Sequence, residues 1–231
     1  MEINFGKQEY YLRCKRGRLQ FCVFKCGHLN RRGDVNAKLK SIIENILKKE
    51  ELHESIEIYL FLEQRFKASE NLKEDYVFRS LFSSFYFMKY VGKAQKDRFF
   101  EAFNHLKDES NLGLDQMIEY YKKIPGDKFQ FSFTTKMLNL INSESPIYDY
   151  HIDKFLSIGY YNNIHSKKEN EKYTKAISVY SKLKEFYQTA KSDSVINDCI
   201  TLLDERFSNK YKLSLNWYKK LDFLLWAGGE P

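Results

Sequence analysis

Apolar side chains recur at helical spacing along most of the chain. Leu, Ile, Phe and Tyr fall at positions i, i+3, i+4 and i+7 within several segments, and polar stretches separate these segments. This spacing gathers the apolar residues on one face of a helix. In residues 55–66 alternate positions are apolar, as in a strand, but the length and the flanks favour a helix. The pattern predicts a mainly α-helical body with helices over 35–51, 55–66, 74–90, 96–106, 112–123, 171–189, 195–207 and 213–226.

Residues 9–27 have a different pattern, which is typical of a β-hairpin. Two runs rich in Tyr, Phe, Val and Leu flank a central Arg-Gly pair. We expect a single domain in which residues 1–34 form a small β-hairpin extension and residues 35–231 form the helical body. The basic tip of the hairpin suits contact with a phosphate backbone, and the alternative is a solvated β-ribbon packed on the helices. The basic residues of this tip are Arg13, Lys15, Arg16 and Arg18.

Composition and charge narrow the class of protein. The 231 residues carry a net charge of +7 and are 43% hydrophobic and 30% charged. These values are typical of a globular chain that can bury a sizeable core. A basic protein favours a polyanionic partner, and nucleic acid is the usual one. A lysine-rich composition also arises from a low-GC coding sequence, so charge alone does not assign the partner.

The sequence gives no sign of membrane insertion or of a metal site. No segment has the layout of a signal peptide, and no run of 18 apolar residues is present. We therefore expect a cytoplasmic, intracellular protein, associated with the nucleoid if it is bacterial. Cys22-x3-Cys26-x-His28 has the spacing of half a metal site but lacks a second half. We expect free thiols, no metal and no other cofactor.

Residues 129–156, FQFSFTTKMLNLINSESPIYDYHIDKFL, contain the side chains best suited to chemistry. A helix is expected to begin near Lys136, capped by the hydroxyl of Ser132 or Thr134, and the alternating phenylalanines before it favour an extended approach. The Ser/Glu/Pro turn ends this helix, and Asp149 lies where the N-cap of a second helix belongs. The starts of the two helices face a common cleft if the connecting loop folds back.

A lysine at a helix start is suited to nucleophilic chemistry. An amine attacks only when it is neutral, and the reference lysine pKa of about 10.4 leaves almost none neutral at pH 7. The positive end of a helix and burial both lower that pKa, so Lys136 is a candidate nucleophile. An ionised Asp149 would stabilise positive charge at a sugar C1′, and the pair suits removal of a base from a nucleotide through a lysine imine. The alternatives are a solvated surface lysine and an aspartate that only caps its helix.

The same stretch resembles the helix-hairpin-helix DNA glycosylases, in particular the 8-oxoguanine glycosylase branch with its shorter bacterial and archaeal members. That family has Leu-Pro-Gly, a glycine hairpin, a catalytic Lys that opens a helix, and then Pro-Val-Asp-x-His. The positions of the hairpin glycines, whose amides bind a phosphate in the family, fall near Ser132 and Thr134. The matching residues in this chain are Ile124-Pro125-Gly126, Thr135-Lys136 and Pro146-Ile147-Tyr148-Asp149-Tyr150-His151.

The resemblance implies a glycosylase-like fold and a DNA glycosylase activity. An oxidised purine is the default base, abasic-site lyase activity is an addition, and the implied partner is duplex DNA with a modified or abasic nucleotide. By this resemblance Lys136 would be the nucleophile and Asp149 the catalytic carboxylate. His151, Ser132 and Thr134 would contact the DNA backbone. Two other functions remain open: a non-catalytic DNA-binding protein on a degenerate glycosylase fold, and a helical protein-interaction module.

Overall fold

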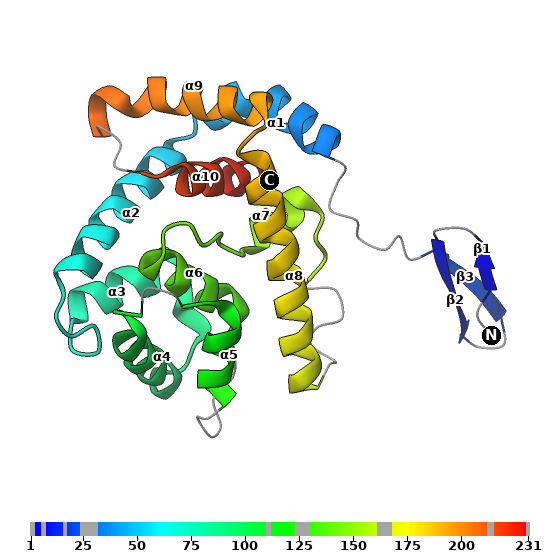
Figure 1. The fold of residues 1–231 in the computed structure, drawn as a ribbon, viewed down its shortest axis with the longest axis horizontal. Coiled ribbons are helices and arrows are strands. Elements are labelled where there is room, and N and C mark those ends of the chain that lie inside the picture. The colour runs from blue at the N-terminus through cyan, green and yellow to red at the C-terminus, as the bar shows by residue number, and fades with distance from the viewer. Residues whose placement is uncertain are drawn as a thin grey trace.

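The computed structural model describes residues 3–5, 8–15, 18–23, 32–109, 112–122, 130–160, 168–211 and 215–229. Most of these residues are helical, which confirms the mainly α-helical class. The helices in the described ranges are α1 (Arg32–Ile46), α2 (Glu50–Ala68), α3 (Tyr76–Phe85), the 3-10 helix η1 (Met88–Tyr90), α4 (Lys93–Leu106), α5 (Leu114–Lys122), α6 (Phe131–Ile141), α7 (Tyr150–Leu156), α8 (Glu169–Ala190), α9 (Ser194–Tyr211) and α10 (Trp217–Gly229) (Figure 1).

Three short strands lie near the N-terminus. They form an antiparallel sheet in the order β1-β2-β3, and Lys15 pairs with Arg18 at the end of the β2–β3 pairing. Arg16-Gly17 of the predicted basic tip lies outside the described residues, as do Cys26 and His28 of the half metal site. The strands are β1 (Ile3–Phe5), β2 (Gln8–Lys15) and β3 (Arg18–Val23).

Two of the predicted long helices are broken in the structure. The helix expected over 35–51 is divided between α1 and α2, which starts at Glu50. The helix expected over 74–90 ends at Phe85, and Phe87 has left-handed backbone angles (φ 55°, ψ 41°) before η1 begins. The apolar spacing continues across both breaks because the pieces on either side bury side chains in one core. The ambiguous segment 55–66 is helical, as expected.

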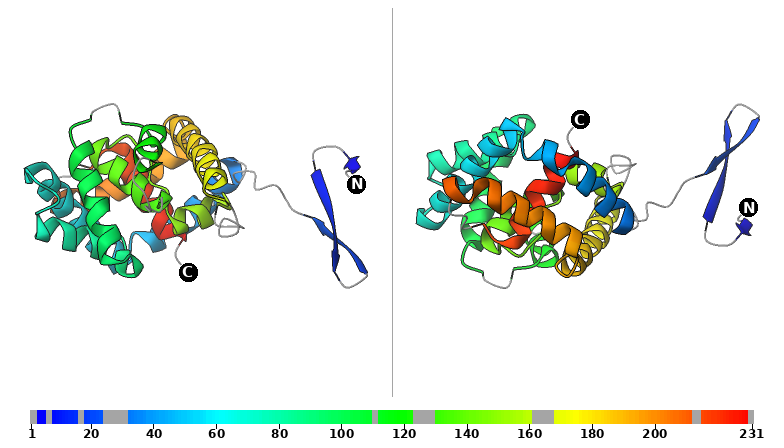
Figure 2. Two further views of the ribbon diagram at one scale, coloured as in Figure 1. Left: turned by 90° about the horizontal axis from the view of Figure 1, so that it is seen from below. Right: turned by 90° about the horizontal axis from the view of Figure 1, so that it is seen from above.

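The helices form two groups, and the long helices α2 and α8 run from one group to the other on opposite sides of the molecule (Figure 1). In the first group α1, α9 and α10 pack on one another, and α7 packs against α10. In the view from above, the orange helix α9 is nearest to the viewer, and in the view from below the green helices of the other group are nearest (Figure 2). The second group, α3 to α6, has an aromatic core. There Phe78 and Phe82 each contact Phe100 and Phe103 at ring-centroid distances of 5.7 to 6.1 Å.

The end of α10 lies directly against the start of α7 at a glycine. A methyl group on Gly229 would overlap the backbone carbonyl of His151, and no side-chain rotation relieves an overlap with backbone. Gly229 therefore lets the two helices approach closely. This contact fixes the start of α7, where the residues of the candidate site are found.

Gly229→Ala is expected to lower the free energy of unfolding by about 1–3 kcal/mol, because an overpacked contact displaces backbone. Each kcal/mol corresponds to a fall of roughly 2–4 °C in unfolding temperature for a chain of this size. Thermal unfolding followed by circular dichroism measures the change. Gly33→Ala in α1 is the matched control, because a Cβ there meets nothing within 4 Å and alanine favours a helix. Unfolding of Gly229→Ala at the wild-type temperature would contradict the close contact.

Candidate functional site

A cavity of about 710 Å³ lies between the two groups of helices. Residues of α2, α3, α6, α7 and α10 and of the segments after α3 and before α7 form its wall. The volume is in the range of pockets that hold small molecules. The wall carries both residues of the predicted pair, Lys136 and Asp149. The other polar or aromatic groups on it include Tyr86, His151, Lys219, Asp222, Phe223 and Trp226.

Lys136 and Asp149 form a mostly buried ion pair on this wall. Lys136 Nζ lies 2.7 Å from Asp149 Oδ2 and donates a second hydrogen bond to Ser132 Oγ at 3.0 Å. The ammonium also lies 5.1 Å from the centre of the Tyr86 ring. Lys136 is only 5% exposed, so it is not a solvated surface lysine.

The helix that carries Lys136 begins earlier than the sequence pattern indicated. α6 starts at Phe131, so Lys136 is its sixth residue and not part of its first turn. The predicted helix start and the predicted extended approach were therefore wrong. Ser132 and Thr134 lie inside the helix, and neither caps it. Lys136 consequently does not lie at the positive end of a helix.

Hydrogen bonds hold the loop after α6 against the helix. Thr135 Oγ1 accepts a hydrogen bond from the backbone N–H of Tyr148 at 3.0 Å. One turn later, Asn139 Nδ2 donates to the backbone carbonyl of Ser145 at 2.7 Å. The loop therefore folds back toward α6, which was the condition for a common cleft. This path places Asp149 beside Lys136.

Asp149 is the N-cap of α7, as predicted. One carboxylate oxygen caps the helix, and the other forms the ion pair with Lys136. Asp149 Oδ1 accepts from the backbone N–H of His151 at 3.0 Å, while Oδ2 faces Lys136. Burial alone would raise the pKa of the Asp149 carboxyl. The Lys136 ammonium and the hydrogen bonds from Lys136 and His151 outweigh it and hold that pKa below its ordinary value. The carboxylate is thus ionised at neutral pH.

A second lysine and a second aspartate, which the sequence reasoning missed, lie on the same wall. Lys219 and Asp222 are three residues apart on α10 and are 4% and 3% exposed. Burial lowers the pKa of Lys219 to about 8, against the opposite effect of Asp222. Burial also raises the pKa of Asp222 to about 6, against the opposite effect of Lys219. The available signal was the charged residues Lys219, Lys220 and Asp222 within the otherwise apolar and aromatic run Trp217–Trp226, because charged residues seldom lie in a buried segment.

Lys219→Met is expected to raise stability at neutral pH, because it removes a buried charge. The pKa of Lys219 falls from 10.5 to about 8 in the fold. Folding therefore disfavours the ammonium, and wild-type stability increases as the pH rises from about 8 to about 10.5. Loss of the counter-charge to the buried Asp222 carboxylate offsets part of this effect, so the variant should gain only about 1–2 kcal/mol at pH 7, and its gain should shrink through that window. The charged groups that face Lys219 are Asp222, Lys136, Glu63 and Asp149.

Urea unfolding of both proteins at neutral pH and at two alkaline pH values measures this difference. Lys220→Met is the control, since the neighbouring Lys220 pairs with Asp204 at 2.7 Å and its side chain is less buried. It should show no gain at neutral pH. A Lys219→Met variant that is less stable than wild type at pH 7 would contradict the expected cost of the buried ammonium.

The residues that the resemblance assigned to DNA contacts differ in their access to solvent. Thr134 is fully buried, and its hydroxyl donates to the Gln130 carbonyl at 2.9 Å. It therefore has no exposed atom to offer a phosphate, and the expected contact is corrected on this point. Ser132 is half-buried beside Lys136. His151 is half-buried on the cavity wall, and its Nδ1 has no hydrogen-bond partner in the described part of the chain. DNA contacts of Ser132 and His151 stay predictions.

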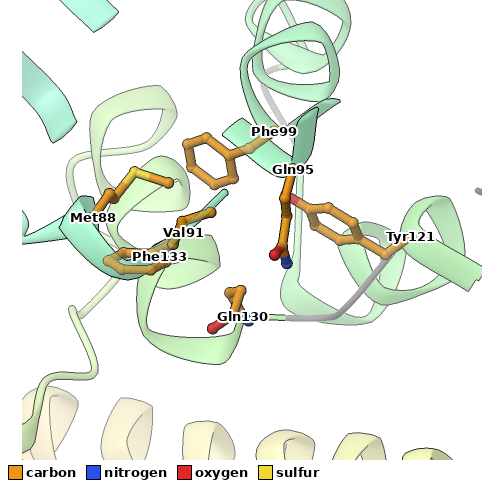
Figure 3. A pocket seen from close by; sticks show the side chains of 7 residues that line it. All are labelled: Met88, Val91, Gln95, Phe99, Tyr121, Gln130 and Phe133. Carbon is orange, nitrogen blue, oxygen red and sulfur yellow. The ribbon is translucent and has the colours of Figure 1, made fainter. Parts of the chain in front are cut away.

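A second space beside α6 is too small to be a ligand site. It has a volume of about 10 Å³, which is room for about one water molecule. Figure 3 shows the aromatic rings of Phe99, Tyr121 and Phe133 and the side chains of Gln95 and Gln130 around it. Among the described residues, no cluster of three or more His, Cys, Asp or Glu side chains could hold a metal ion. The 710 Å³ cavity is therefore the candidate site.

Known proteins give no relative from which a function can be transferred. No family model matches the chain, and no curated protein and no solved structure matches it. Within the described ranges, no helix is both long and apolar enough to cross a membrane. The groups of the cavity itself are therefore the basis for assigning a function.

Proposed function

We propose that this protein is a DNA glycosylase that removes a modified base from duplex DNA through a lysine imine. The oxidised purines are the default substrates, and abasic-site lyase activity is an addition. The observation that supports this best is the buried pair on the cavity wall, in which Lys136 Nζ lies 2.7 Å from Asp149 Oδ2. The pair unites a candidate nucleophile with a carboxylate that is ionised at neutral pH.

In the proposed reaction the Lys136 ammonium first gives up a proton to solvent, and the neutral amine then attacks the sugar C1′. A bond forms between Nζ and C1′, the bond from C1′ to the base nitrogen breaks, and the base leaves with the electron pair. Positive charge develops at C1′ and O4′, and the Asp149 carboxylate stabilises it. The amine nitrogen then loses a proton to the departing base, and opening of the sugar ring gives the imine. The imine acidifies the C2′ hydrogens, so elimination of the 3′ phosphate is the additional lyase step.

The charge of the chain and the surroundings of the cavity support duplex DNA as the substrate. The net charge of +7 favours a polyanion. A glycosylase must extrude the target nucleotide into a pocket, at a cost of a few kcal/mol in lost stacking. Phe87 and Tyr150 line the cavity and are 71% and 56% exposed. Exposed aromatic rings at the opening of a pocket are suited to stack on bases, which offsets part of that cost.

A non-catalytic DNA-binding protein on a degenerate glycosylase fold is the second candidate. The observation in its favour concerns Thr134, which lies near a hairpin-glycine position of the resembled family. The Thr134 amide donates to the Gln130 carbonyl inside α6 and is not free to bind a phosphate. A helical protein-interaction module is the third interpretation. It differs from the first two because it predicts no salt-dependent DNA binding.

Borohydride trapping tests the proposed function. Wild-type protein is incubated with borohydride and with duplexes that carry an abasic site, an 8-oxoguanine or no lesion, and any adduct is digested and located by mass spectrometry. We expect an adduct at Lys136 with a damaged duplex and none with the undamaged one. Salt-sensitive DNA binding without an adduct or base release would favour the non-catalytic binder. Absence of DNA binding would favour the interaction module.

A further inference from the structure

The ammonium of Lys219 has no hydrogen-bond acceptor within the described part of the chain. Lys219 is 4% exposed, and its described hydrogen bond is made by its backbone N–H, to Asn216 Oδ1. Nζ lies 4.0 Å from the centre of the Tyr59 ring and 4.9 Å from the centre of the Phe223 ring. A lysine ammonium has three donors. Two ring contacts compensate only in part for burying those donors without an acceptor.

The neighbouring charged groups do not supply the missing acceptor. Lys136, on the same wall, already uses Asp149. Asp222, one turn after Lys219, uses Oδ1 to accept from Tyr187 Oη at 2.5 Å and from the Ile147 N–H at 3.3 Å. Its Oδ2 makes no hydrogen bond among the described residues. Because Lys219 lies on the cavity wall, a ligand in the cavity can provide an acceptor.

We propose that Lys219 donates a hydrogen bond to the exocyclic carbonyl oxygen of the extruded base and so selects bases that carry such a carbonyl. This inference rests on the proposed glycosylase function and names the substrate class of the same cavity. Guanine-type bases and hypoxanthine carry a carbonyl at C6, whereas adenine carries an amino group there. The amino hydrogens would face the ammonium, so a donor would meet a donor and both would stay unsatisfied.

The same contact assists the departure of the base. When the bond from C1′ to the base nitrogen breaks, the electron pair passes to the base and is delocalised onto the carbonyl oxygen. An ammonium placed at that oxygen stabilises the developing negative charge, and its buried position strengthens the interaction. Lys219 therefore acts on the leaving group, while Lys136 and Asp149 act on the sugar.

Comparison of base release with trapping at an abasic site tests this role. Wild type, Lys219→Met and Lys220→Met are assayed in single turnovers on duplexes that carry 8-oxoguanine, hypoxanthine, adenine or a preformed abasic site. An abasic site has no base for Lys219 to contact, so trapping there is an internal reference for the nucleophile and the cavity. We expect the ratio of base release to trapping to fall at least about 100-fold in Lys219→Met. Lys220→Met, whose Nζ pairs with Asp204, should keep the wild-type ratio.

The wild type is also expected to release hypoxanthine at least about tenfold faster than adenine from otherwise identical duplexes. An unchanged ratio in Lys219→Met overturns the role of Lys219 and leaves the glycosylase proposal standing. Parallel loss of base release and of abasic-site trapping also overturns it, because Lys219 would then serve the sugar chemistry or the structure of the cavity. Release of adenine as fast as hypoxanthine overturns the substrate class. A wild type that releases no base and forms no adduct overturns the proposed function itself.

Discussion

Lys136→Gln is expected to abolish the borohydride-trapped adduct, with a fall of at least about 10³-fold in the rate of its formation. Glutamine is neutral and uncharged at every pH, so it fits the buried position and can still hydrogen bond to Asp149, but it has no amine to attack C1′. Single-turnover trapping on a duplex with a preformed abasic site measures the loss. Fluorescence anisotropy with the same duplex should show that DNA binding is largely retained, because Lys136 is 5% exposed and not part of the outer surface.

Lys67→Gln provides the matched control for this substitution. Lys67 is also a helical lysine in an ion pair, with Glu63 at 2.9 Å, but its side chain is 68% exposed and does not line the cavity. It should trap the abasic duplex at the wild-type rate. An adduct that persists in Lys136→Gln would show that Lys136 is not the nucleophile, and mass spectrometry would then decide whether Lys219 takes its place.

The pairing of Lys136 with Asp149 was predictable from the sequence because its determinants are local. A Ser/Glu/Pro turn of a few residues separates two short apolar helices, and an aspartate before the second helix is a preferred N-cap. The start of α6 was not predictable from the same residues. Hydroxyl side chains serve equally as caps and as donors to carbonyls of the preceding turn. Thr134 and Thr135 take the second role and donate to Gln130 and Ser132.

Lys219 and Asp222 could not be assigned because their surroundings come from distant parts of the chain. Asp222 bonds to Tyr187 and Ile147, which are 35 and 75 positions away. The cavity itself requires α2 and α3 on one side and α7 and α10 on the other. Periodicity predicts which face of a helix is buried, and it says nothing of which other helix covers that face. The residues that line a cavity between helices are therefore those that a single sequence identifies least well.

Asp149→Asn isolates the charge of the carboxylate from its role as a helix cap. Asparagine caps a helix about as well as aspartate, and its carbonyl oxygen can accept from the His151 N–H that Asp149 Oδ1 now binds. The rate of base release is expected to fall by about 10²–10³-fold, because the positive charge that develops on the sugar loses its counter-charge. Single-turnover release on the duplex that the wild type prefers measures this effect.

Stability gives the second signature of the same substitution. The pKa of Asp149 is lowered in the fold, so its ionised form contributes stability above the unfolded pKa of about 4, and this is lost as the pH falls through the folded pKa. Asp149→Asn should be less stable than wild type at pH 7, and the free energies of unfolding of the two proteins should converge in acid.

Asp153→Asn, on the same helix but outside the cavity wall, provides the contrast. Asp153 accepts from the backbone N–H groups of Gly159 and Tyr160, so its loss should lower stability and leave the rate per folded molecule unchanged. Equal effects of both substitutions on that rate would show that α7 needs a carboxylate for its structure and that Asp149 does not act on the sugar.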